Sequence, residues 1–336
     1  MNPRSEHNPR IIDALILSHG TAQSYYLTLD PKRNNIARPS MDNPLPCADA
    51  LSRTFEGVNT NYAGFGNGPF EVLVPQSELR RSRSGLITHC SSLDLPKGSF
   101  WKFRTSLYIS SPELCFVQMA NKLSQARLVE LGINLCAKYY LHPRSGEIFE
   151  REPITTVAKL KAYLERIDSS YHGVRNAQRA LKWVVDNTAS PMESRCAILI
   201  HYSKRYGGCG FPLIEANHRV NPGSFKHLAE QGYFEIDGCW PDKFTGYEYL
   251  GDKEHQDLAK DMRRIDALSA LGWHIVTFNK KVFYNPDAFD VAVRQLARHM
   301  RIRIRRQPDW SEKMLELRRE LGLLDDTPHY FEEMHG

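Results

Sequence analysis

The stretch 233–278 constrains the fold most, because two short apolar segments with one acid each precede an amphipathic segment and another apolar one. The acids are Asp237 and Glu248. Apolar residues recur at helical spacing after them, at Leu258, Met262, Ile265, Leu268 and Leu271. Gly272 then ends the predicted helix, and 273–278 reads as a strand covered on both faces. Strand, strand, helix, strand with acids at one end is a layout that can hold a divalent metal ion.

A helix and a strand are predicted directly upstream. Ser190 and Pro191 suit the cap and first turn of a helix that runs to about residue 202, and 211–220 reads as the first strand. Glu193 has two roles open, which do not exclude each other. It is either the acid of a capping box that reaches back to the Ser190 amide, or a helix-borne acid aimed at a metal.

These motifs resemble the nuclease domains related to the very-short-patch-repair endonuclease, in the PD-(D/E)XK superfamily. The matching set, in order, is Asp237 before Trp240-Pro241, Glu248, His255, Asp261 with Arg264, and Gly272-Trp273. The resemblance covers about the last third of the chain. It implies an α/β (α+β) fold with a restriction-endonuclease-like mixed sheet flanked by helices. It also implies a Mg²⁺ or Mn²⁺ cofactor.

The resemblance assigns roles to the acids and the histidine. Asp237 is the principal metal ligand, Glu248 is the second ligand or orients water, and His255 is an acid or base. Structural alternatives stay open: Asp237 caps the turn at Gly238, Glu248 forms a rim salt bridge, and His255 lies on the surface. Glu193 joins the catalytic candidates.

Basic residues near the acids are candidates for holding a substrate phosphate. They are Lys253, Arg263 and Arg264. An ion pair with Asp261 along the helix is the favoured alternative for at least one of the two arginines. Leu250 departs from the family pattern, which has Lys or Asp two residues after the second acid. Leucine cannot stabilise an attacking hydroxide, so Lys253 or His255 would have to replace that function, or the site only binds.

The first half of the chain resembles the core of AbiEi-type antitoxin proteins. The match is Ser18-His19 with Thr21-Ala22, a strand at 70–74, and Ser110-Ser111-Pro112 entering a helix. We therefore predict an AbiEi-like α+β domain over 1–150, a helical linker over 151–188, a nuclease domain over 189–306, and a C-terminal helix and tail over 307–336. The alternating Arg and Ile of 301–306 predict an edge strand, with either a solvated or a nucleic-acid-facing basic side.

Composition narrows the compartment and the partners. The chain has 336 residues, a net charge of +5, 41% hydrophobic and 25% charged residues, which is ordinary for a soluble protein and permits a DNA partner. Its seven cysteines are scattered, which predicts reduced thiols, and no signal-peptide core or membrane span is recognisable. We expect a cytoplasmic protein.

Two functions follow as hypotheses. The first is a metal-dependent endonuclease that hydrolyses DNA phosphodiester bonds in defence or repair. The second is an inactive nucleic-acid-binding regulator, antitoxin-like, with a toxin-antitoxin or defence partner protein. Leu250 and the AbiEi-like half favour the second.

Overall fold

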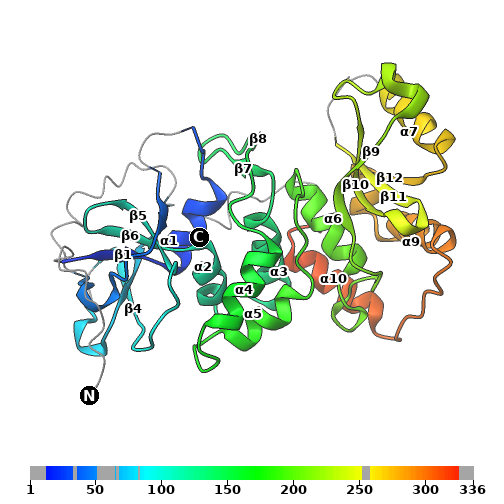
Figure 1. Cartoon of the computed structure of the whole chain (residues 1–336). Helices are drawn as coiled ribbons and strands as arrows, with labels where there is room; N and C mark the ends of the chain where they lie inside the picture. Colours follow the sequence, from blue (N-terminus) through cyan, green and yellow to red (C-terminus); the bar gives the residue numbers. More distant parts are fainter. Residues whose placement is uncertain are drawn as a thin grey trace. The chain divides into compact units, whose positions relative to one another are not determined.

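The computed structural model describes residues 13–32, 36–50, 65, 68–81, 84–251 and 258–324. These residues form two compact units, which are treated separately (Figure 1). Among them, unit 1 holds the described residues of 13–135 and 139–182, and unit 2 holds 136–138 with the described residues of 183–324. The mixed helix-and-strand composition agrees with the predicted α+β class.

Unit 1 is built on a six-stranded sheet in the order β2-β5-β6-β1-β3-β4. Its strands are β1 (Leu15–Leu17), β2 (Arg38–Ser40), β3 (Phe70–Val74), β4 (Leu86–Cys90), β5 (Phe100–Arg104) and β6 (Leu107–Ser110). β1 runs parallel to β6 and β3 parallel to β4, whereas the other neighbours are antiparallel. The predicted strands at 70–74 and 86–90 and the hairpin at 100–109 are confirmed.

Helices complete unit 1. They are α1 (His19–Leu27), α2 (Pro112–Met119), α3 (Gln125–Leu135), α4 (Val157–Arg166) and α5 (Val174–Leu181), beside the hairpin β7 (Tyr139–Leu141) and β8 (Ile148–Glu150). Ser111 caps α2 as predicted, because its hydroxyl accepts the Leu114 amide at 3.2 Å. α4 and α5, which the sequence assigned to a linker, pack against α2 and α3.

Unit 2 carries a four-stranded sheet in the order β12-β11-β10-β9. Its elements are α6 (Pro191–His201), β9 (Glu215–Val220), β10 (Phe234–Trp240), β11 (Thr245–Leu250), α7 (Leu258–Ala270), β12 (His274–Asn279), α8 (Lys280–Tyr284), α9 (Pro286–His299) and α10 (Trp310–Glu320). β9, β10 and β11 are antiparallel, and β12 joins parallel to β11 after the α7 crossover. The sequence predicted this order from α6 to β12.

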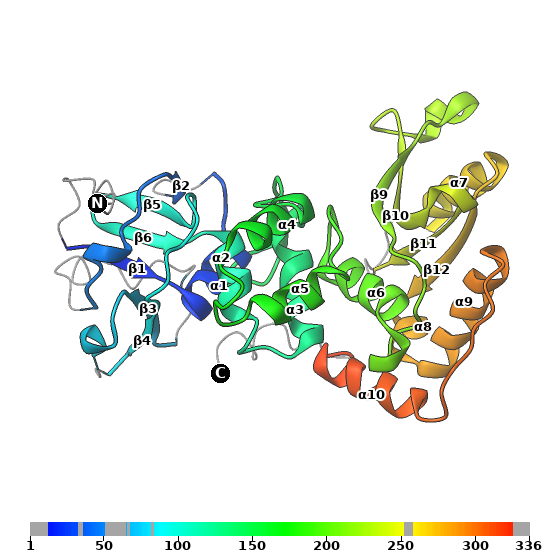
Figure 2. The ribbon, with the colours of Figure 1, turned by 60° about the horizontal axis from the view of Figure 1, so that its bottom comes forward.

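Helices cover both faces of the unit 2 sheet (Figures 1 and 2). On one face Ala267 and Leu268 of α7 pack in a core with Ile236 and Ile275. On the other, Phe278 of β12 meets Phe289 of α9. The strand β12 is thus covered on both sides, as its apolar sequence without clean alternation predicted.

The segment after α9 differs from its prediction. Residues 302–307 form no strand, so the predicted edge strand at 301–306 is wrong. Arg306 instead pairs with Asp290 and stacks over the Trp310 ring at 3.8 Å. Arg301, Arg303 and Arg305 are exposed, and the alternation of exposed and half-buried residues here occurs without a strand.

Candidate functional site

The predicted acid pair lies at facing positions of two neighbouring strands. β10 and β11 pair through Gly238 with Tyr247, Cys239 with Gly246, and Trp240 with Thr245. One step further along this register, Asp237 faces Glu248. Facing residues of an antiparallel pair have Cβ atoms about 4.5–5.5 Å apart. Here the hydrogen bond between the strands involves a side chain: the Tyr249 backbone amide donates to Asp237 Oδ2 at 2.7 Å.

The Glu248 carboxylate is buried and only half satisfied. The residue is 2% exposed. Arg264 on α7 donates through Nη2 to Glu248 Oε2 at 2.7 Å and through Nη1 to the Glu235 carbonyl at 2.8 Å. The other oxygen, Oε1, is buried without a hydrogen-bond partner among the described residues. An unpartnered buried carboxylate oxygen is costly unless a ligand completes it.

Glu193 approaches the same region from the first turn of α6. The Ser190 hydroxyl accepts the Glu193 amide at 3.2 Å, as a helix cap should. The carboxylate, however, accepts the Ala189 amide at 2.7 Å, so the predicted return bond to the Ser190 amide is wrong by one residue. Its Oε2 also accepts the Asn217 side-chain amide at 2.8 Å. Asn217 lies on β9 at the position facing Asp237, between two paired positions.

Burial raises the pKa of all three acids, and Asp237 also feels the charges of the other two. Burial, then repulsion by Glu248 and Glu193, holds the pKa of Asp237 well above its ordinary value. Burial raises the pKa of Glu248 to about 7, although the Arg264 guanidinium opposes that shift. Burial is also the main cause that raises the pKa of Glu193. Mutually repelling buried carboxyls are the arrangement that a bound cation would relieve.

This donor set suits a hard cation. Mg²⁺ and Mn²⁺ prefer carboxylate oxygens and keep several waters, so one or two acids suffice. Asp237 and Glu248, the latter through its unpartnered Oε1, are the residues that would hold such an ion. Glu193 lies nearby and holds the side chain of Asn217. Arg264 already supplies one positive charge on Glu248 Oε2, which leaves Oε1 available.

Other predicted site residues are placed as follows. Lys253 and His255 lie outside the described residues. Arg263 is exposed on α7, whereas Arg264 turns inward. The ion pair of Arg264 is with Glu248 at 2.7 Å rather than with Asp261, so the favoured helix pairing does not apply to Arg264. Leu250 ends β11 beside Asn279 of β12 and contributes no charge there.

Sequence reasoning missed two groups. Arg264 was read as a phosphate or Asp261 contact, but its partner Glu248 lies on a strand 16 residues earlier. In unit 1, His19, Glu71 and His89 bring three potential metal ligands within 4.8 Å of one another. A Glu within an apolar strand, Phe70–Val74, and a His within the next were the available signals.

Comparison with known proteins gives no support for any family. No family model matches the chain, and neither a curated protein nor a solved structure does. In the described part of the chain, no helix is both long and apolar enough to cross a bilayer.

Proposed function

We propose that unit 2 is a Mg²⁺- or Mn²⁺-dependent endonuclease that hydrolyses DNA phosphodiester bonds. The observation that carries the proposal is the pair Asp237 and Glu248, which face each other on β10 and β11 with Glu248 Oε1 buried and unpartnered. A solvated salt-bridge role would have left that oxygen in water. Its burial beside a second acid instead suits a ligand position.

The order of elements supports the restriction-endonuclease-like assignment. The chain runs helix, three antiparallel strands, helix, parallel strand, from α6 to β12. The acids lie on the central strands β10 and β11 and on the first turn of α6, as the resemblance implies. The net charge of +5 is compatible with a phosphate-backbone partner.

The residues of the proposed site would have different roles in catalysis. A hard divalent ion supplies a nucleophilic water and a counter-charge for the developing phosphorane. Asp237, fixed by the Tyr249 amide, and Glu248, fixed by Arg264, would hold the ion in one place. Arg264 opposes the rise in the pKa of Glu248 and orients its carboxylate, and is therefore a positioning residue. Glu193 is held by two donors and keeps Asn217 against the site.

A nicking assay tests the proposal. The full chain is incubated with supercoiled plasmid and Mg²⁺ or Mn²⁺, beside Asp237→Ala and Asp242→Ala. Asp242 is the matched control, because its side chain is 72% exposed in the turn that follows the same strand. We expect metal-dependent nicking by the wild type and by Asp242→Ala, and none by Asp237→Ala. If neither DNA nor RNA is cut under any metal and Asp237→Ala behaves like the wild type, the nuclease proposal fails.

A second candidate is a DNA-binding regulator with a retired nuclease site. Leu250 favours it, because it stands two residues after the second acid, where the family has Lys or Asp. DNA binding that falls steeply with salt, without cleavage, would support this candidate. The antitoxin-like resemblance of unit 1 and a toxin or defence partner belong to the same proposal. Salt-independent binding would count against both candidates.

A further inference from the structure

A second cluster of ligand-type side chains lies in unit 1, far along the chain from the acids discussed above. His89 Nε2 contacts Glu71 Oε2 at 2.5 Å, and the rings of His19 and His89 stack with centroids 3.5 Å apart. One ligand atom of each residue lies within 4.8 Å of the other two. Two imidazoles and one carboxylate form a ligand set common in zinc sites with an open fourth position.

The backbone is adapted to bring these groups together. His19 has a φ of 45°, in the left-handed region that non-glycine residues rarely adopt. Gly20 follows, and a Cβ there would overlap Glu71 Oε1, so only glycine lets the carboxylate reach the start of α1. Its amide donates to that oxygen at 3.1 Å. Such strain persists where the surrounding structure demands it, often at functional sites.

Outer contacts fix the orientation of the ligands. His19 Nδ1 lies 3.0 Å from the Ser18 hydroxyl, which leaves Nε2 as the ligand atom, and the His19 amide donates to Gln118 Oε1 at 3.2 Å. A hydrogen bond at the second ring nitrogen is a regular feature of metal-binding histidines. Glu71 is buried, while His89 keeps a quarter of its side chain exposed.

We propose that His19, Glu71 and His89 form a binding site for a transition-metal ion of the Zn²⁺ type. The ion would lie between the two imidazoles and Glu71 Oε2, in place of the present contact between His89 and that oxygen. This site is independent of the endonuclease proposal, since all its residues belong to unit 1. Imidazole nitrogens favour Zn²⁺ or Co²⁺ over Mg²⁺, which distinguishes the two sites chemically.

Lys122 forms an ion pair with the Glu71 carboxylate. Its Nζ contacts Glu71 Oε1 at 2.7 Å and Oε2 at 2.6 Å. The side chain is 39% exposed, so the ammonium can withdraw to solvent or keep Oε1 alone. Lys122 therefore acts as an internal cation that competes with the metal. A site that serves only as an ion pair capping α1 would need this ammonium, whereas a metal site would gain from its removal.

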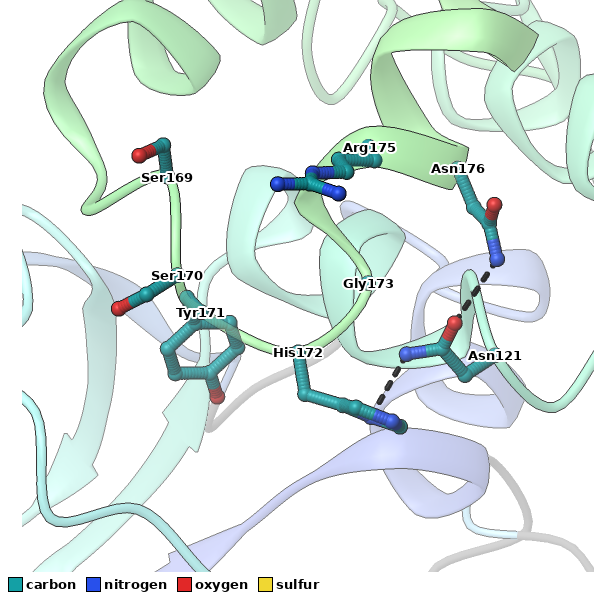
Figure 3. Close-up of a pocket in the computed structure, with 8 residues that line it drawn as sticks. All are labelled: Asn121, Ser169, Ser170, Tyr171, His172, Gly173, Arg175 and Asn176. Carbon is teal, nitrogen blue, oxygen red and sulfur yellow. Dashed lines mark hydrogen bonds between the residues drawn. The ribbon is translucent and has the colours of Figure 1, made fainter.

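A cavity of about 320 Å³ lies in the same unit as the cluster. Its lining includes His172, which is within electrostatic range of His19, and Asn121, the neighbour of Lys122. Figure 3 shows Asn121 bonded to both His172 and Asn176, at 2.6 and 2.8 Å. This chain of hydrogen bonds fixes His172 at the rim of the cavity.

Metal titration of the full chain tests the site. Chelator-treated protein is titrated with Zn²⁺ against a chromophoric chelator, and with Co²⁺ while the visible d–d absorption is followed. The variants are His19→Ala, His89→Ala, Ser18→Ala and Lys122→Met, with His227→Ala as an exposed-histidine control. Every variant is repeated in an Asp237→Ala background, so that metal bound at the proposed nuclease site does not contribute.

We expect one Zn²⁺ per chain in both backgrounds. Ser18→Ala should weaken binding by about 10- to 100-fold, as outer-contact losses do, and each histidine variant by more. Lys122→Met should tighten binding by about fivefold, because it removes the partly exposed cation that competes for Glu71, and His227→Ala should change nothing. The proposal is overturned if wild type binds no Zn²⁺, if histidine variants bind it equally well, or if Lys122→Met weakens binding.

Discussion

Replacing Glu248 by glutamine should stabilise the protein at alkaline pH. Burial raises the pKa of this carboxyl from 4.5 to about 7. The folded state therefore holds a proton that the unfolded chain has released, and stability falls as the pH rises from 4.5 to 7. At 1.36 kcal/mol per unit, the ionised carboxylate costs about 3 kcal/mol above pH 7. Glutamine imitates the protonated form and avoids that cost.

Urea unfolding of wild type and Glu248→Gln between pH 4.5 and 8 measures the effect. The difference in unfolding free energy between the two should grow by about 3 kcal/mol toward pH 8 in favour of the variant. Asp242→Asn, at an exposed acid, should show no such trend. Mn²⁺ should stabilise the wild type and not Glu248→Gln, since only the folded carboxylate binds it. A pH-independent difference, or a variant less stable at pH 8, would refute the reasoning.

Three further predictions concern the same unit. Arg264→Met removes the cation that opposes the raised pKa of Glu248, so it should destabilise the protein by urea unfolding, and more at pH 8 than at pH 5, where the carboxyl is protonated. Gly238→Ala places a Cβ against the buried Tyr247 ring and should cost about 1–3 kcal/mol in the same assay. Burial lowers the pKa of His201 from 6.5 to about 4, so wild type should lose about 3 kcal/mol as the pH falls from 6.5 to 4. His201→Gln should not show that loss in acid unfolding.

The local elements of unit 2 followed from periodicity and capping signals. Ser190 before Pro191 predicted the start of α6, and the apolar spacing from Leu258 to Leu271 predicted α7. Gly272 follows α7 with a left-handed φ of 89°, which glycine allows. Each of these signals acts within about one or two helical turns. Sequence patterns of that range carry most of what decides an isolated helix or strand.

Contacts between segments that are distant in the sequence could not be predicted from such local patterns. Arg264 points inward to Glu248 because β11 and α7 pack together, and helix spacing alone favoured Asp261. Likewise His19, Glu71 and His89 meet only because β1, β3 and β4 are neighbours in the sheet and α1 begins at the end of β1. The facing positions of Asp237 and Glu248 were easier to predict, because a short connection fixes the register of two consecutive strands.

The central claim is that Asp237 and Glu248 hold one divalent ion. A crystal grown with MnCl₂, measured for anomalous scattering, tests it most directly. We predict a manganese peak about 2.0–2.3 Å from a carboxylate oxygen of Asp237 and from Glu248 Oε1, with Arg264 still on Oε2. A map without a peak between these two side chains, at Mn²⁺ concentrations that occupy other sites, would contradict the account.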